Sequence, residues 1–459
     1  MKILTTIITL FLTNLAFAQS FYFGADMSYV NEMEDCGAKF HERGIAKSPY
    51  EIFENYNCNL VRLRLWNNPN WYQNLNEGKI YSDLDDVKRA IAKAKAHNMS
   101  VLLDFQLSDT WADSKKQVVP KNWVNIVDDT ERLKDTLYDY IFQTLLELQT
   151  ENLLPEMVQI GNETNKEILL PKTTDATWKM NWERNAILFN SAITAVRDFE
   201  KMFNKKLKIM LHISSPENVE WFINSFIENG VTDFDIIGIS YCWAWHKPTS
   251  IKATGEVIRN LRATYPKKSV IIVETGYIWT TESNDEAPNI VRETHPDFSP
   301  ATPINQRDWL IEMTQEVINN GGQGVVYWEP CWVSTSCSTL WGKGSHQEHA
   351  TFFDFNNNLL IPGGIQFMTH EYDFTKETIE PNNISILTNS FSGEIMIDLK
   401  KAEPIMFKIF NEKNQLLQVG NSNNKLTYLR INNMPFGVYK IVIHTKEEKQ
   451  EKVFKYNDI

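Results

Sequence analysis

Two short apolar runs that each end in a glutamate constrain this chain most. Val158–Ile160 leads through a Gly–Asn pair into Glu163, and Val270–Val273 leads directly into Glu274. Each run has the length of a strand and is too apolar to face water, so both are predicted to be buried strands of a parallel sheet. In a barrel of parallel strands, active sites lie at the carboxyl ends of the strands. Both glutamates are therefore expected in one site.

Further strand-like runs alternate with amphipathic segments along most of the chain. The predicted strands are Phe21–Asp26, Asn59–Trp66, Ser100–Phe105, Glu156–Gly161, Leu207–Ile213, Asp235–Tyr241, Ser269–Glu274 and Gln323–Trp328. The predicted helices are Leu84–His97, Glu131–Leu148, Trp182–Glu200, Pro216–Asn229, Ser250–Thr264 and Asn305–Asn320. This alternation predicts an α/β fold of the (β/α)8 TIM-barrel type. An open doubly wound sheet is the alternative, but it needs a Gly-rich phosphate-type turn after its first strand, which this sequence lacks.

The character of the sequence changes after about Thr375. Helical periodicity gives way to short β-type runs between Asn- and Gly-rich turns: Ile395–Leu399, Ile405–Phe410, Lys425–Ile431 and Val438–Ile443. We expect a catalytic domain at 19–375, a linker at 376–383 and a small antiparallel β-sandwich-like module at 384–459. The module shows no acid–base constellation, so no chemistry is assigned to it.

Residues 1–18 have the features of a signal peptide. Lys2 precedes the mostly apolar Ile3–Ala16, and Ala16–Phe17–Ala18 is a small-x-small cleavage signal. Cleavage would leave Gln19 first, without a cysteine for a lipid anchor, and the apolar run is short for a spanning helix. We therefore expect a secreted or cell-surface protein without membrane insertion. The net charge of −12 argues against nucleic acid or an anionic membrane as a partner.

Five cysteines in an exported chain leave at least one unpaired. Cys331 and Cys337 are close enough in sequence to clip a loop, and Cys36 with Cys58 is the second candidate pair. Cys242 lies at a predicted strand end, where we expect a buried thiol.

Two glutamates delivered from different strands suit glycoside hydrolysis, in which one carboxyl group donates a proton and the other acts as nucleophile. Glu163 and Glu274 follow the fourth and seventh strands, which can place their carboxyl groups about 5–5.5 Å apart, the spacing of a retaining mechanism. The 14 tryptophans also suit sugar binding, although core packing accounts for part of them. Glu329 is the rival acid at a strand end, and the proline after it favours an orienting role.

Other residues near the strand ends are candidates for accessory contacts. Arg62 and Arg64 share one strand face, and such an arginine can keep the nucleophile ionised; a structural salt bridge inside the barrel is the alternative. Tyr241 could hydrogen-bond Glu274 and keep its pKa low. The remaining candidate contacts with substrate are Asp104, Asn162, Trp243, His246 and Trp328. Loop capping is the alternative for Asp104, and a structural role is the alternative for His246.

The same segments resemble those of the glycoside hydrolase family 53 endo-β-1,4-galactanases. The matching residues are Phe23–Ser28, Val61–Asn67, Leu103–Phe105, Ser108–Asp113, Gln159–Glu163, Gly238–Tyr241, Val273–Thr275 and Tyr327–Pro330. The resemblance implies Glu163 as acid/base and Glu274 as nucleophile in a retaining endo-hydrolase of β-1,4-galactan, a side chain of pectin. One departure is Gln106–Leu107, where the family usually has His–Tyr, and it concerns a single subsite contact.

The resemblance implies no required cofactor and no catalytic metal. Some family members bind calcium in the loops after strands seven and eight. Asp285, Glu286 and Asp297 lie in this region, without the ordered ligand spacing of a hard-cation site. Calcium is therefore expected as a structural ion at most.

The C-terminal module resembles the sorting domains that Bacteroidetes-type bacteria use for type IX secretion. The resemblance is carried by Phe407–Asn411, Phe436–Ile443 and the basic ending Lys452–Lys455, and it implies the secretion machinery as a partner. A carbohydrate-binding module is the rival, weakened by the lack of tryptophan in this region. For the whole chain, the rival functions are a barrel hydrolase of mannan or cellulose and a non-catalytic glycan-binding protein.

Overall fold

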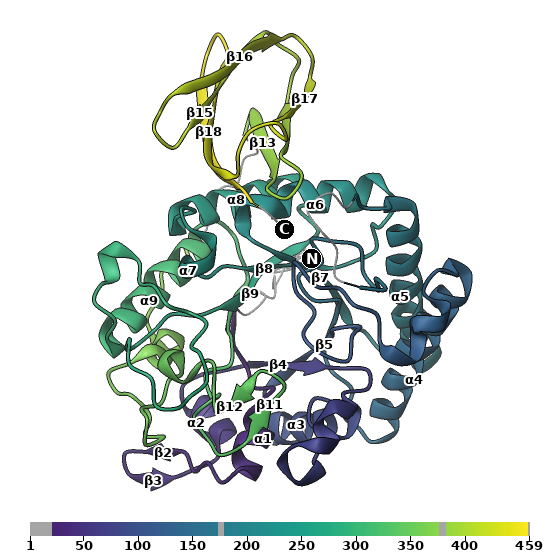
Figure 1. The fold of residues 1–459 in the computed structure, drawn as a ribbon, viewed down its shortest axis with the longest axis vertical. Coiled ribbons are helices and arrows are strands. Elements are labelled where there is room, and N and C mark those ends of the chain that lie inside the picture. Colours follow the sequence, from purple (N-terminus) through teal and green to yellow (C-terminus); the bar gives the residue numbers. More distant parts are fainter. Residues whose placement is uncertain (1–20, 173–178, 376–381, 458–459) are drawn as a thin grey trace, which may run out of the picture.

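The computed structural model describes residues 21–172, 179–375 and 382–457. Parallel strands close into a barrel in the order β1–β10–β9–β8–β7–β6–β5–β4 (Figure 1). The barrel strands are β1 (Tyr22–Asp26), β4 (Leu60–Leu65), β5 (Ser100–Phe105), β6 (Met157–Ile160), β7 (Lys208–Ser214), β8 (Ile236–Ser240), β9 (Ser269–Thr275) and β10 (Gly324–Tyr327). The predicted (β/α)8 barrel is confirmed. The predicted signal peptide and most of the predicted linker lie outside the described residues.

Helices surround the barrel on its outside (Figure 1). The larger ones are α2 (Pro49–Asn55), α3 (Leu84–Ala96), α4 (Thr130–Thr150), α5 (Trp182–Phe203), α6 (Pro216–Glu228), α8 (Ile251–Thr264) and α9 (Pro303–Asn319). Their starts follow from the sequence, since the side chains of Asp83, Asn181 and Ser250 each accept a backbone N–H in the first turn. Three short helices were not expected from the sequence: α1 (Val30–Asp35), α2 and α7 (Trp243–His246).

The barrel interior is apolar at depth and polar above. Eight buried side chains form the apolar layer: Leu60, Leu102, Met157, Met210, Ile236, Ile271, Val273 and Val326. Two residues further along four of these strands, the same inward face carries Arg62, Asp104, Gln159 and His212, all buried. Alternate residues of a strand share a face, so the polar layer lies directly above the apolar one, at the carboxyl ends of the strands.

The C-terminal module consists of two antiparallel sheets that enclose their own apolar core. One sheet is β13 (Ile384–Asn389), β14 (Glu394–Leu399) and β17 (Leu426–Arg430); the other is β16 (Leu416–Ser422), β15 (Ile405–Asn411), β18 (Gly437–His444) and β19 (Lys449–Tyr456). This architecture agrees with the expected sandwich-like module. The sequence did not reveal β13, β16 and β19. The module packs with β13 against α6, beside the barrel (Figure 1).

The disulfide joins two regions that are remote in sequence. Cys36, at the end of α1, is bonded to Cys337 with a Cα–Cα distance of 5.9 Å, within the normal range. Cys337 immediately precedes a small hairpin formed by β11 (Ser338–Thr339) and β12 (Gly342–Lys343). Both predicted pairings are therefore wrong, because Cys58 and Cys331 are free buried thiols. Cys242 is also a free buried thiol, as expected.

None of the described helices combines the length and the apolar character needed to cross a membrane.

Candidate active site

A cleft of about 970 Å³ opens at the carboxyl ends of the barrel strands. Glu163 and Glu274 both line it. Aromatic rings form much of its wall, contributed by Trp111, Trp245, Trp328, Trp332 and Trp341. Trp328 occupies a central place among them, with its ring centroid 5.8 Å from that of Trp111 and 6.4 Å from that of Trp245. A cleft with flat apolar walls and two carboxyl groups suits a sugar chain.

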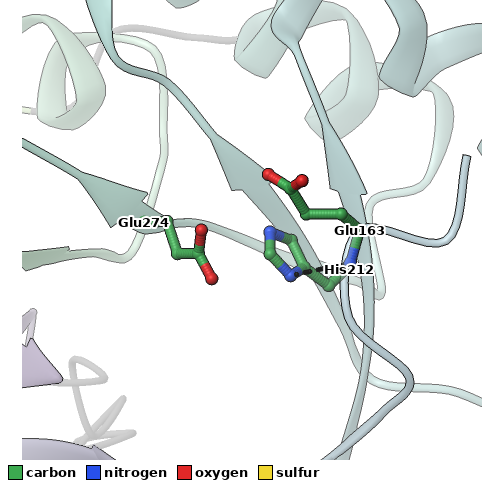
Figure 2. Close-up of side chains that lie close together, drawn as sticks. All are labelled: Glu163, His212 and Glu274. Carbon is green, nitrogen blue, oxygen red and sulfur yellow. Dashed lines mark hydrogen bonds between the residues drawn. The ribbon is translucent and has the colours of Figure 1, made fainter. Parts of the chain in front are cut away.

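The backbone turns sharply where β6 delivers Glu163. Gly161 has a φ of +72°, and a Cβ added there would lie 2.6 Å from the Thr164 side chain. Glu163 itself has a φ of +46°, an uncommon conformation for a residue with a side chain. Its N–H donates to His212 Nδ1 at 3.3 Å (Figure 2), and Gln117 Nε2 donates to its carbonyl at 3.3 Å. Strained backbone that its neighbours hold in place is typical of functional sites.

A β-bulge orients Glu274. The pairing of β8 with β9 shifts register between Ile239 and Ser240, so that Ser240 pairs with Glu274 while Ile239 pairs with Ile272. Val273 consequently belongs to the apolar layer inside the barrel, yet its neighbour Glu274 also reaches the cleft. Bulges near active sites commonly redirect a side chain in this way.

The two carboxyl groups face one another across the end of the barrel (Figure 2). One carboxylate oxygen of Glu163 and one of Glu274 lie within 4.8 Å of each other. The Ser240 hydroxyl lies between them, 2.7 Å from Glu163 Oε1 and 3.4 Å from Glu274 Oε2. Burial, assisted by the charge of Glu274, raises the pKa of Glu163 to about 7. Burial also raises the pKa of Glu274, but the adjacent Arg62 guanidinium opposes the rise. The pair is thus asymmetric: the surroundings favour the protonated form of Glu163, whereas Arg62 favours the ionised form of Glu274.

Arg62 is the cation beside Glu274. Its Nη1 lies 2.6 Å from Glu274 Oε1. Its other donors are also satisfied by buried acceptors, namely Asp26, Asp104, Gln159 and Asn162, at 2.7–3.1 Å. A planar guanidinium held at every edge has one orientation, so Arg62 positions Glu274 as well as neutralising it.

Arg64, the arginine selected from the sequence as the accessory residue, does not contact Glu274. Its guanidinium pairs with Glu329 at 3.1 Å, and both side chains are buried. The Tyr29, Trp66 and Trp111 rings lie 4.1–4.4 Å from its central carbon. Glu329 also accepts the Tyr29 N–H at 3.2 Å. Unlike Glu163 and Glu274, Glu329 does not line the cleft, which agrees with an orienting role.

Of the other residues selected from the sequence, Asn162, His246 and Trp328 line the cleft. Asp104 is fully buried beneath it, paired with Arg62 at 2.8 Å, so it supports the site and does not contact substrate. Trp243 packs against His295, with ring centroids 4.4 Å apart, and Trp245 lines the cleft in its place.

The prediction that Tyr241 hydrogen-bonds Glu274 is wrong. The Tyr241 hydroxyl donates to the Thr249 carbonyl at 2.8 Å. The preceding residue, Ser240, supplies the hydroxyl instead. The physical reason is strand alternation: Ile236 and Ser240 share the inward face, so Tyr241 points outward.

His212 and Ser240 are the functional candidates that the sequence reading missed. His212 Nε2 lies 2.8 Å from Ser240 Oγ, and its Nδ1 lies 2.9 Å from Asn162 Oδ1. Burial and the nearby Arg62 charge lower the pKa of His212 well below its usual value, so the ring is neutral. Strand alternation could have revealed His212, because it lies two residues after Met210, which faces the barrel interior.

Some donor groups around the cleft are of the types that bind metal ions. In the part of the chain that the structure describes, Glu163, His212 and Glu274 are the one group of three acidic, His or Cys side chains close enough to share an ion. Arg62 already pairs with Glu274, so a second cation fits poorly there. Asp285 accepts the N–H groups of Ala287 and Ser345. Calcium therefore stays a prediction from the resemblance.

Comparison with known proteins places this site in a family. The sequence model of glycosyl hydrolase family 53 matches residues 22–363. An "Arabinogalactan endo-beta-1,4-galactanase" of Cellvibrio japonicus is 47% identical over 352 residues, covering 76% of this chain and 91% of the relative. An "Endo-beta-1,4-galactanase" of Bacillus subtilis is 31% identical, covering 73% and 78%. The solved "Ignisphaera aggregans GH53 catalytic domain" is 29% identical with a TM-score of 0.68, covering 77% of this chain and 97% of that one. The chain belongs to glycosyl hydrolase family 53.

Proposed function

We propose that the protein is a secreted, retaining endo-β-1,4-galactanase that hydrolyses galactan and type I arabinogalactan. The observation that carries the proposal is the asymmetric pair of carboxyl groups, Glu163 and Glu274, within 4.8 Å of each other in an aromatic cleft. Inverting enzymes separate their carboxyl groups by roughly 6.5–9.5 Å to admit a water, whereas retaining enzymes use a closer pair. The substrate follows from the names of the two bacterial relatives.

In the first step, Glu274 attacks the anomeric carbon while Glu163 protonates the departing glycosidic oxygen. The carbon–oxygen bond to the leaving sugar breaks as the bond to the Glu274 carboxylate forms. A pKa of about 7 keeps Glu163 protonated in mildly acidic solution. The Arg62 charge favours the ionised form of Glu274, so each carboxyl group starts in the state that its role requires.

In the second step, Glu163 acts as a base. It takes a proton from water, the resulting oxygen nucleophile attacks the anomeric carbon, and the Glu274 carboxylate leaves with the bonding pair. The Ser240 hydroxyl donates to Glu163 and so stabilises the ionised form that this step needs. Two inversions at one carbon give net retention of configuration.

The proposed location rests on the sequence of residues 1–18, which has the pattern of a signal peptide. We further propose that the C-terminal module serves type IX secretion, on the resemblance of its strand sequences to sorting domains. Size analysis of the protein exported by its native host, with and without residues 384–459, tests both proposals. We expect the full-length protein to be exported and the form without the module to be retained in the cell. Retention of the full-length protein would contradict the secreted location, and export of the form without residues 384–459 would contradict the role of the module.

The activity is tested by reducing-sugar release from linear β-1,4-galactan, with mannan and cellulose in parallel. We expect release from galactan, with the β-anomer formed first in proton NMR of the fresh products. Activity on mannan or cellulose alone would overturn the substrate and leave the two-carboxylate mechanism standing. Binding of galactan without any hydrolysis would instead indicate a glycan-binding protein.

A further inference from the structure

The C-terminal module forms part of the wall of the catalytic cleft. Ser390 and Phe391, in the turn between β13 and β14, line the cleft together with Lys455 and Asn457 at the end of β19. The Asn457 N–H donates to the Ser390 carbonyl at 2.9 Å, so the two segments meet at one edge. All four residues lie beyond residue 363, where the family match ends.

Hydrogen bonds attach this edge of the module firmly to α6. The Ser390 N–H and hydroxyl both donate to Asn218 Oδ1, at 2.8 and 2.9 Å. The Thr388 hydroxyl donates to the Glu217 carbonyl at 2.7 Å. Lys452 Nζ lies 3.2 Å from the Glu220 carboxylate, and that side chain is largely buried. Buried polar contacts of this kind fix both the position and the orientation of the attached element.

The two larger side chains at this edge are placed against the barrel. The half-buried Phe391 packs against the apolar core of the barrel while part of its surface lines the cleft. The positive charge of Lys455 reaches His246, another residue of the cleft wall: burial and this charge together lower the pKa of His246 to about 4. The module therefore presents an aromatic ring, an ammonium and an amide to the same space as Glu163 and Glu274.

We propose that the module completes the cleft with a sugar-binding subsite at its edge, in which Phe391 contacts the apolar face of a pyranose while Lys455 and Asn457 hydrogen-bond its hydroxyls. An aromatic surface with a few convergent polar groups is the usual composition of a site for a neutral sugar. The occupant is a galactosyl unit of the polymer, so the inference rests on the proposed function. The module would then take part in catalysis on long chains, whether or not it also serves secretion.

The test compares full-length variants on long and short substrates. Phe391→Ala and Lys455→Met remove the ring and the ammonium, and Tyr428→Ala and Lys425→Met are matched controls on the exposed face of the module. For Phe391→Ala we expect KM on galactan to rise roughly five- to tenfold, the effect of losing one aromatic contact. For Lys455→Met we expect a smaller rise. In both variants kcat on a short aryl galactoside should match wild type, and the product sizes from galactan should change.

Several results separate this inference from the proposed function. Unchanged KM and unchanged product sizes in both variants, with galactan cleaved normally by wild type, would overturn the subsite. An equal loss on long and short substrates would also overturn it, because that pattern indicates a structural role. If Phe391→Ala lowers the melting temperature, its kinetics do not test the subsite. The KM and product sizes of Lys455→Met, which keeps the aliphatic part of the side chain, then decide whether the subsite exists. If wild type cleaves only another polysaccharide, the galactanase proposal fails and the same comparison on that polymer judges the subsite independently.

Discussion

Two arginine–glutamate ion pairs originate from alternate positions on β4, and they differ in what surrounds them. Arg62 meets Glu274 at 2.6 Å, and 13% of the Glu274 side chain is exposed to the cleft. Arg64 meets Glu329 at 3.1 Å, with 1% and 0% of the two side chains exposed. Glu274 lies near the carboxyl end of β9 and Glu329 follows β10, and both face an arginine. Access to the cleft distinguishes the proposed nucleophile from the buried Glu329.

The pairs also differ in how their arginines are supported. Arg62 contacts three carboxylates, those of Asp26, Asp104 and Glu274, so loss of Glu274 leaves it with two partners. Among the described residues, Arg64 has Glu329 as its one ion-pair partner. Removing one member of a buried pair leaves an uncompensated charge, which costs about 3–5 kcal/mol. Substitution of Glu274 should therefore chiefly lower activity, and substitution of Glu329 should chiefly lower the free energy of unfolding.

Glu274→Ala is expected to have the largest effect on activity. Without its proposed nucleophile the enzyme should lose kcat on galactan by a factor on the order of 10⁵ or more, while its melting temperature stays close to that of wild type. Steady-state kinetics and thermal unfolding check both parts. Added azide should restore turnover of an activated aryl galactoside and give the α-galactosyl azide. Near-normal activity would move the nucleophile to another residue and contradict the comparison.

Glu163→Gln is expected to follow, with a loss of about 10²–10⁴-fold on galactan, the usual contribution of a general acid. The rate of the first, glycosylation step should fall much less for a substrate whose leaving group needs no proton, such as a dinitrophenyl galactoside. Because the folded-state pKa of Glu163 is raised to about 7, wild-type folding loses stability as pH rises from about 4.5 toward 7. The stability of Glu163→Gln relative to wild type should therefore increase from pH 5 to pH 8. An equal loss for all leaving groups would contradict the acid role.

Glu329→Ala tests the buried Arg64–Glu329 pair. We expect the free energy of unfolding to fall by about 3–5 kcal/mol, with kcat of the folded fraction reduced less than tenfold. Chemical denaturation and active-site titration separate the two quantities. Glu329→Gln is the matched control, because its amide oxygen can still accept from Arg64. A stable Glu329→Ala protein without activity would place Glu329 in the chemistry and erase the distinction between the two pairs.

The sequence predicted the barrel and its two glutamates because both depend on local pattern. Apolar runs of strand length define β6 and β9, and parallel strands bring their ends together whatever the loops do. The surroundings of the inward-facing side chains were not predictable in the same way. Arg62 and Arg64 share one face, and tertiary packing places Arg64 among the Tyr29, Trp66 and Trp111 rings, away from Glu274.

Other features of the site escaped prediction for equally specific reasons. Cys36 and Cys337 are 301 residues apart, so no spacing rule could pair them. The bulge at Glu274 breaks the alternation that sequence reading relies on. The hydroxyl beside Glu274 comes from Ser240 and not from the predicted Tyr241, because alternation along β8 turns the serine inward and the tyrosine outward. The module's contribution to the cleft depends on docking, which leaves no mark in a local pattern.

Ser240→Ala is expected to have the smallest effect and to report on the asymmetry of the catalytic pair. The Ser240 hydroxyl donates to Glu163 at 2.7 Å and lowers its pKa, against the larger effect of burial. Removing the hydroxyl should raise that pKa. Since the first step needs protonated Glu163, the alkaline limb of kcat/KM, expected near pH 7 in wild type, should move to higher pH.

The same substitution should slow the second step, which needs ionised Glu163, so burst kinetics with a fast-leaving aryl galactoside should show more accumulated glycosyl-enzyme than wild type. Thr249→Ala is a suitable control, because the Thr249 hydroxyl donates to Glu217 and to neither Glu163 nor Glu274, while the Thr249 carbonyl that accepts from Tyr241 is kept. An alkaline limb that moves to lower pH would mean that Ser240 chiefly stabilises protonated Glu163. Glu163 would then donate to the serine oxygen, and the serine would donate to Nε2 of the other neutral tautomer of His212, 2.8 Å from Ser240 Oγ.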